Sequence, residues 1–167
     1  MAYRHPPRNG SLGFELKTEL EMTPAGAGVK CAERREGKTI GELEISPFPA
    51  RLIIDRDGVL ESKVREVASA TGRVRSAVPV TLPGATGYRA EVVLARGAEL
   101  PYVYVFAMAP EDGGMEGGVL VTVRSASPEW PAAEATLQSI RIVTRRGVVH
   151  ANDGDSLALP IIGPLLD

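Results

Sequence analysis

The stretch Leu100-Pro-Tyr-Val-Tyr-Val-Phe-Ala-Met108 decides the fold class of this chain. Side chains alternate between the two faces of an extended segment, because the side-chain period of a strand is two residues. Apolar side chains here fill both alternating rows, which are Tyr102, Tyr104 and Phe106, and Val103, Val105 and Ala107. A strand that is apolar on both faces belongs in the middle of a sheet that is covered on both sides.

Shorter strands are predicted on the N-terminal side of this stretch. Phe14 to Met22 alternates apolar and charged residues, which predicts one half-buried strand. Val29–Ala32 and Ile40–Ile45 are expected to form a hairpin around the polar turn 33–38. Residues 52–54 could continue the sheet after Pro47 and Pro49.

Four more segments alternate in the same way. A hairpin is predicted around the turn at 83–87, with two apolar rows: Val74, Ser76, Val78, Val80 and Leu82, then Tyr88, Ala90, Val92 and Leu94. Residues 119–123 predict another strand, and Ile140, Ile142 and Thr144 predict a final one.

Two segments have helical spacing. Asp57 is expected to cap a helix that runs to about Thr71, before Gly72. Ser127-Pro128 predicts the start of a second helix, in which Trp130, Ala133 and Leu137 share one face. The sequence therefore predicts an α+β fold, an antiparallel β-sheet of about six to eight strands with two main helices packed on it.

A chain of 167 residues has the length of one domain. We expect a flexible N-terminal tail over 1–11, a single α+β domain over 12–146, and a C-terminal extension over 147–167. Ten mostly apolar residues, 157–166, lie in that extension. They are expected to dock on their own domain, with formation of a homodimer as the alternative.

The composition argues against several classes of partner. A net charge of -2 provides no field that would attract nucleic acid. The apolar stretches 100–110 and 157–166 are about half the ~20 residues that a membrane helix needs, so no membrane span is expected. No apolar export signal follows the N-terminal arginines, which favours a cytoplasmic protein.

No catalytic motif is visible in the sequence. The only histidines, His5 and His150, lie outside any motif, and there is no nucleophile elbow, phosphate-binding glycine loop or zinc-binding helix. The only cysteine, Cys31, alternates with Val29 and is interpreted as a buried structural thiol. We therefore expect no catalytic residue and no cofactor.

One segment is similar to the start of a calcium loop. Asp55-Arg56-Asp57-Gly58 places oxygen ligands at alternate positions, and Glu66 occupies the twelfth. Val59 and Leu60 stand where further oxygen ligands are needed, so the interpretation is a helix cap, and no metal site is expected.

The aromatic residues have two interpretations. Tyr88, Tyr102, Tyr104 and Trp130 lie in apolar rows and are read as core residues with a polar tip, or as anchors of a ligand groove. If a groove exists, we expect it where the row of Tyr102 and Tyr104 meets the helix that bears Trp130.

The C-terminal half resembles a known fold. Two strands around 84–88, an aromatic strand, Ser127-Pro128-Glu129-Trp130 and then Leu137-Gln138-Ser139-Ile140-Arg141-Ile142 resemble the group of PsbP, the Ran-binding Mog proteins and the bacterial LpqN and DcrB lipoproteins. The resemblance implies a sheet with packed helices, in a group whose members mostly bind proteins or other molecules. The chain departs from LpqN and DcrB in lacking a lipoprotein cysteine near its start and in its extra residues 148–167.

These observations predict a non-catalytic cytoplasmic binding or accessory module with a protein partner. The first alternative is a chaperone-like adaptor for a secreted protein, a role known for some cytosolic proteins that resemble DcrB. The second is a small enzyme or ligand carrier, which would need a deep pocket with converging polar groups.

Overall fold

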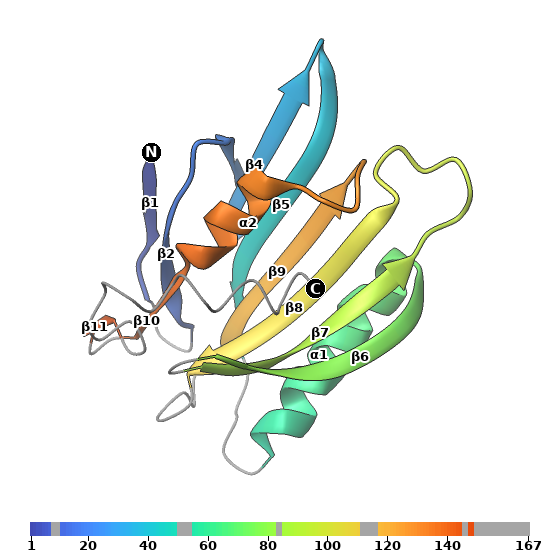
Figure 1. Cartoon of the computed structure of the whole chain (residues 1–167). Coiled ribbons are helices and arrows are strands. Elements are labelled where there is room, and N and C mark those ends of the chain that lie inside the picture. Colours follow the sequence, from blue (N-terminus) through green and yellow to red (C-terminus); the bar gives the residue numbers. More distant parts are fainter. Residues whose placement is uncertain (8–10, 50–54, 83–84, 111–116, 145–146, 149–167) are drawn as a thin grey trace.

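Two antiparallel sheets and two helices make up the part of the chain that the computed structural model describes (Figure 1). The described residues are 1–7, 11–49, 55–82, 85–110, 117–144 and 147–148. The elements in chain order are β1 Ala2–His5, β2 Gly13–Lys17, β3 Glu21–Ala25, β4 Gly28–Arg35, β5 Lys38–Phe48, α1 Arg56–Thr71, β6 Arg73–Leu82, β7 Ala85–Val93, β8 Tyr102–Pro110, β9 Gly118–Ser125, α2 Pro131–Gln138, β10 Arg141–Thr144 and β11 Gly147–Val148.

The large sheet has the strand order β3-β4-β5-β9-β8-β7-β6, and the small sheet has the order β1-β2-β10-β11. β8 pairs with β9 on one side and with β7 on the other, so the strand that is apolar on both faces lies inside the sheet. The predicted α+β class, with two helices packed on an antiparallel sheet, is confirmed. Division of the strands between two sheets was not predicted.

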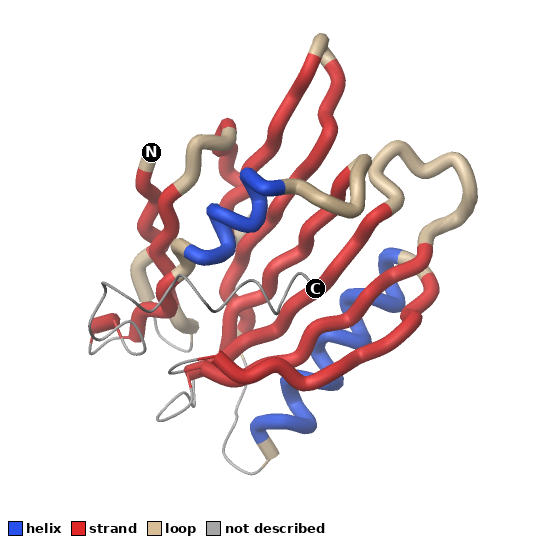
Figure 2. Tube along the Cα trace, in the orientation of Figure 1, coloured by secondary structure: helices blue, strands red, loops and turns tan. Residues whose placement is uncertain are grey.

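The two helices cover opposite faces of the large sheet, which we name the α1 face and the α2 face (Figures 1 and 2). On the α1 face, Leu60, Val64 and Ala68 repeat every four residues and pack against Val103 and Val105 of β8. Burial of each large apolar side chain favours folding by about 1.5–3 kcal/mol, which fixes the helix on this face.

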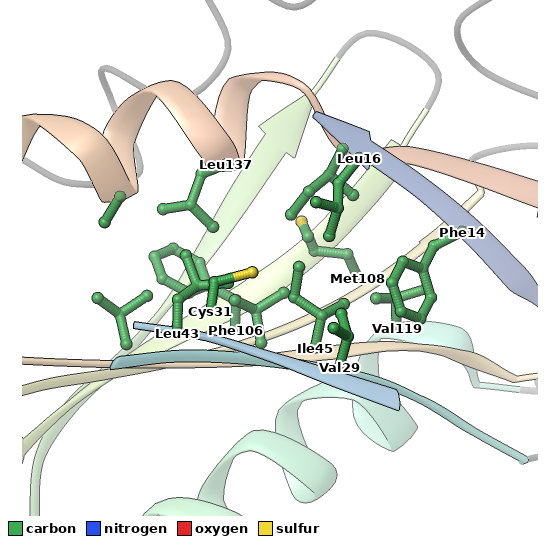
Figure 3. Packing of buried hydrophobic residues seen from close by; sticks show 14 of the residues in the cluster. Phe14, Leu16, Val29, Cys31, Leu43, Ile45, Phe106, Met108, Val119 and Leu137 are labelled. Atoms are coloured by element: carbon green, nitrogen blue, oxygen red, sulfur yellow. The ribbon is translucent and has the colours of Figure 1, made fainter. Parts of the chain in front are cut away.

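The α2 face is covered jointly by α2 and the small sheet. Leu137 of α2 and Phe14 of β2 pack with Cys31 and Phe106 of the large sheet in one buried cluster (Figure 3). Val103 and Phe106 therefore lie in different cores, as the alternation along β8 predicted.

The N-terminal residues are part of the fold. Ala2–His5 forms β1 and pairs with β2, so the prediction of a tail over 1–11 is wrong for this segment. Tyr3 contacts Phe14 with ring centroids 5.6 Å apart, and His5 stacks on the same ring at 5.3 Å. The sequence pattern did not indicate a partner for so short a strand.

Residues 14–22 form two strands in different sheets rather than one. The Thr18 hydroxyl accepts a hydrogen bond from the Leu20 amide at 3.0 Å and also bonds the Thr136 hydroxyl at 2.7 Å. The chain therefore turns at Thr18, and Leu20 still reaches the core although the strand ends at Lys17.

The hairpin of β4 and β5 has a tighter turn than the predicted 33–38. Glu36 and Gly37 have φ values of 52° and 79°, and Arg35 pairs with Lys38. Two successive residues with positive φ make the two-residue turn that matches the twist of a hairpin. Strand β4 therefore extends to Arg35 and includes Glu33.

The predicted single row from Val74 to Leu82 is also wrong. The pairing of β6 with β7 shifts between Val74 and Ser76, which is a β-bulge. Val74 consequently packs on the α1 face, whereas Val80 packs on the α2 face. The predicted row of Tyr88, Ala90, Val92 and Leu94 does lie together on the α1 face.

Both helix starts differ from prediction. Asp55, and not Asp57, is the N-cap of α1, and its carboxylate accepts a hydrogen bond from the Gly58 amide at 2.9 Å. α2 begins at Pro131, three residues after Pro128, with Trp130 at the N-cap.

Some of the predicted segments lie outside the described residues: 52–54, 145–146 and 149–167. Within the described residues, neither helix has the length and hydrophobicity that a membrane crossing requires.

Candidate functional site

A hollow lined by aromatic side chains lies where β8 and β9 meet the start of α2. Its volume is about 200 Å³. Tyr102, Tyr104 and Trp130 all line it, and we call it the aromatic hollow. The other lining residues are Val123, Ser125, Ser127, Pro128, Glu129, Pro131, Ala133 and Glu134. The structure thus brings together the three residues that the sequence placed in a possible groove.

Strand register brings these residues to one place. Glu33 of β4 is opposite Gly41 of β5, Gly41 is opposite Ser125 of β9, and Ser125 is opposite Tyr102 of β8. Directly opposed residues in antiparallel strands project from the same face. One row across four strands therefore places a glutamate, a glycine without a side chain, a serine and a tyrosine side by side on the α2 face.

Trp130 lies over the glycine of this row, Gly41. A Cβ atom on Gly41 would stand 2.7 Å from atoms of the indole ring, so only glycine lets the ring approach so closely. The indole Nε1–H donates to the Glu33 Oε1 at 2.8 Å. Trp130 is therefore held by the neighbouring pair Glu33 and Gly41, and its N–H group is already bonded.

The segment between β9 and α2 is fixed by its own hydrogen bonds. The Ser125 hydroxyl donates to the Ser127 carbonyl at 2.6 Å and accepts from the Ser127 amide at 3.1 Å. The Ala126 amide donates to the Ile40 carbonyl at 2.9 Å. Pro131 then occupies the first turn of α2, where its missing N–H costs nothing. These contacts hold Trp130 at the edge of the hollow.

The two tyrosines differ in exposure. Tyr102 has 42% of its surface exposed, which is unusual for a large aromatic side chain next to a core. Tyr104 is partly buried, and the Arg89 guanidinium lies 5.7 Å from its ring centroid. Tyr88 packs on the α1 face and does not belong to this site.

Two carboxylates border the hollow. Glu129 precedes α2, and Glu134 lies in its first turn. No lysine, arginine or histidine is found among the described residues that line the hollow. The aromatic hollow thus combines exposed ring surface with negative charge.

Two other hollows, of about 490 and 620 Å³, lie between the small sheet and α2 and share Ala2, Lys17 and Ala135. Two polar side chains of the hollow of about 490 Å³ are bonded within the fold. The Ser139 hydroxyl accepts from the Lys17 amide and donates toward the Lys17 and Thr136 carbonyls, at 2.7–2.8 Å. Arg141 donates to the Ile140 carbonyl at 3.0 Å. These contacts join β2 to the end of α2.

Other reactive groups lie away from the aromatic hollow. Cys31 is buried in the α2-face core, and burial raises the pKa of its thiol to about 11. His5 lies in β1 against Phe14, and His150 is outside the described residues. Over the described ranges, no group of three or more His, Cys, Asp or Glu residues could hold a metal ion.

Sequence reasoning missed Gly41, Glu33 and the acidic residues of the hollow. A glycine inside the strand 38–48 is itself a signal of close approach by another group, and it could have indicated Gly41. The sequence pattern places Glu33 in the polar turn 33–38, and only the register of β4 against β5 places it beside Trp130.

No match to this chain was found among protein-family models, curated proteins or solved structures. The resemblance to the PsbP and Mog group therefore stays a prediction.

Proposed function

We propose that this chain is a non-catalytic binding or accessory module of the cytoplasm, and that the aromatic hollow is where it binds a protein partner. The observation that carries the proposal is that Tyr102 and Tyr104 of β8 and Trp130 at the start of α2 line one hollow, in which Tyr102 is 42% exposed. Tyrosine and tryptophan are enriched in the energetically important centres of protein interfaces.

The size of the hollow supports a protein partner. Pockets for small molecules usually have volumes of ~300–1,000 Å³, and this hollow measures about 200 Å³. It has room for one side chain of a partner that also contacts the surface around it. A ligand carrier would instead use the two larger hollows beside the small sheet, and Ser139 and Arg141, which line the hollow of about 490 Å³, are bonded within the fold.

One observation favours the chaperone-like adaptor as the second candidate. Val78 of β6 and Tyr102 of β8 are exposed, at 37% and 42%, and both lie on the α2 face. An apolar segment of a client protein would cover both side chains. This candidate predicts contacts across β6, β7 and β8, whereas the first requires contacts at Trp130.

Site-specific photo-cross-linking in cells of the source organism tests the proposal. A photoreactive phenylalanine analogue replaces Tyr102 in one variant, and exposed Ser69 of α1, on the opposite side of the sheet, in a matched control. We expect a defined protein adduct from position 102 and none from position 69. Excess unlabelled protein should compete for this adduct, and excess Tyr102→Ala protein should not. The same adducts from both positions would contradict the proposal.

A further inference from the structure

We infer that the aromatic hollow receives a cationic side chain, arginine or lysine, from the partner protein. The inference rests on the proposed function, because it names the chemistry of the group that enters the same site. Three features of the hollow carry it: its aromatic surface, its carboxylates and the bonded state of its indole N–H.

The aromatic surface provides one half of the recognition. A guanidinium or ammonium group is attracted to the face of a tryptophan or tyrosine ring by the ring quadrupole. The protein already contains this interaction at one lining residue, since the Arg89 guanidinium lies 5.7 Å from the centroid of the Tyr104 ring. Tyr102 and Trp130 present further ring surface in the hollow.

The carboxylates of Glu129 and Glu134 provide the other half. They carry two full negative charges, against a partial positive charge of about +0.5 at the start of α2. Arg89 contributes one positive charge near Tyr104 but does not line the hollow. The balance around the opening is negative, so an incoming cation is favoured over an anion.

The Trp130 N–H group argues against a neutral proline-rich segment as the occupant. Aromatic grooves bind such segments by packing against proline rings, and hydrogen bonds to the carbonyls of the segment would need free donors. Here the indole N–H is already donated to Glu33 at 2.8 Å. The hydroxyl groups of Tyr102 and Tyr104, the ring faces and the carboxylates remain for the ligand, and the rings and carboxylates attract a cation.

The chain contains a single tryptophan, so its nitrogen-labelled NMR spectrum has one indole N–H signal, which belongs to Trp130. The probe is the peptide acetyl-Ala-Arg-Ala-amide, and its neutral control carries citrulline in place of arginine. Both are titrated to about 20 mM at matched ionic strength, because exposed charges are screened by salt. The expected result is that the arginine peptide shifts the Trp130 signal and binds roughly fivefold or more tightly than the citrulline peptide.

Matched variants test the carboxylates. Glu129→Gln and Glu134→Gln should each weaken binding of the arginine peptide about threefold. The control is Glu66→Gln, at an exposed position of α1 on the opposite side of the sheet, and it should leave binding unchanged. Equal effects of all three substitutions would overturn the inference, as would equal binding of the two peptides or no binding of either.

These failures are distinguishable from failure of the proposed function. A cross-linked partner at position 102 combined with equal binding of the arginine and citrulline peptides would keep the binding site and reject the cationic ligand. If position 102 also yields no specific adduct, both proposals are rejected.

Discussion

At the scale of single residues, the site depends on a contact between Trp130 and the backbone of β5. Gly41→Ala adds a Cβ atom that would stand 2.7 Å from the indole ring, so the ring must move. We expect a loss of about 1–2 kcal/mol in the free energy of unfolding and a red-shifted Trp130 emission, because the bond to Glu33 is strained. Urea unfolding followed by tryptophan fluorescence measures both quantities.

The matched control for this substitution is Ser46→Ala, at a partly buried position of the same strand. It should leave the emission maximum unchanged. A Gly41→Ala protein with wild-type emission and stability would show that the close packing of Trp130 on β5 is absent in solution.

Cys31 makes a prediction about alkaline pH. Burial raises the pKa of its thiol from 9.0 to about 11, so the native protein retains a proton that the unfolded chain loses. Ionisation of the thiol has no effect on stability below about pH 9, and stability falls as the pH rises from about 9 toward 11. Wild type should lose about 2 kcal/mol relative to Cys31→Ala between pH 8 and about pH 10.5.

Denaturant unfolding of both proteins across this pH range checks the prediction. Comparison with Cys31→Ala removes the contributions of lysines and tyrosines, which titrate in both proteins. A stability difference that stays constant with pH would mean that the thiol ionises equally well in the native state.

At the scale of elements, two aspartates at the start of α1 are expected to contribute unequally to stability. Asp55→Ala removes the hydrogen bond to the Gly58 amide and should lower the free energy of unfolding by about 1 kcal/mol. Asp57→Ala removes only a charge from the first turn and should cost about 0.3–0.5 kcal/mol. Thermal or urea unfolding of the two variants measures the difference, and a larger loss for Asp57→Ala would reassign the cap.

Some elements could be predicted from the sequence because their patterns are local. The rows of β8 and β7 follow from alternation alone, and the buried positions of α1 follow from helical spacing. The break at Thr18 depends on its hydroxyl meeting Thr136, which is 118 residues away. The bulge in β6 likewise depends on its pairing with β7, which the sequence pattern does not specify.

At the scale of the whole molecule, β1 closes one edge of the α2-face core. Removal of residues 1–5 would delete the β1–β2 ladder and uncover Phe14, against which Tyr3 and His5 pack. We expect a loss of about 2–3 kcal/mol in the free energy of unfolding. Arg4→Ala, which breaks only the exposed pair with Glu15 at 3.4 Å, should change it by less than about 0.5 kcal/mol.

Chemical unfolding of the truncated protein and of Arg4→Ala tests this assignment. Equal stability of the truncated and full-length proteins would mean that the N-terminal residues contribute nothing to the domain, as a tail would.

The candidate site was partly predictable for a physical reason. Alternation placed Tyr102 and Tyr104 in one row, and helical spacing placed Trp130 beside the sheet. The side chains that complete the hollow come from register and loop geometry: Ser125 is set opposite Tyr102, and α2 begins at Pro131 rather than at Pro128. The pairing of Ser125 with Tyr102 is not encoded in a local pattern, whereas Pro131 is itself a signal for a helix start that competes with Pro128.

The measurement that bears most directly on the binding function is the affinity of the cross-linked partner for purified variants of this protein. Tyr102→Ala should weaken binding at least tenfold, because interface aromatic residues contribute roughly 2 kcal/mol or more, while Ser69→Ala on the opposite side of the sheet should bind like wild type. Equal affinity of wild type and Tyr102→Ala, with both proteins folded, would contradict the assignment of the aromatic hollow as the binding site.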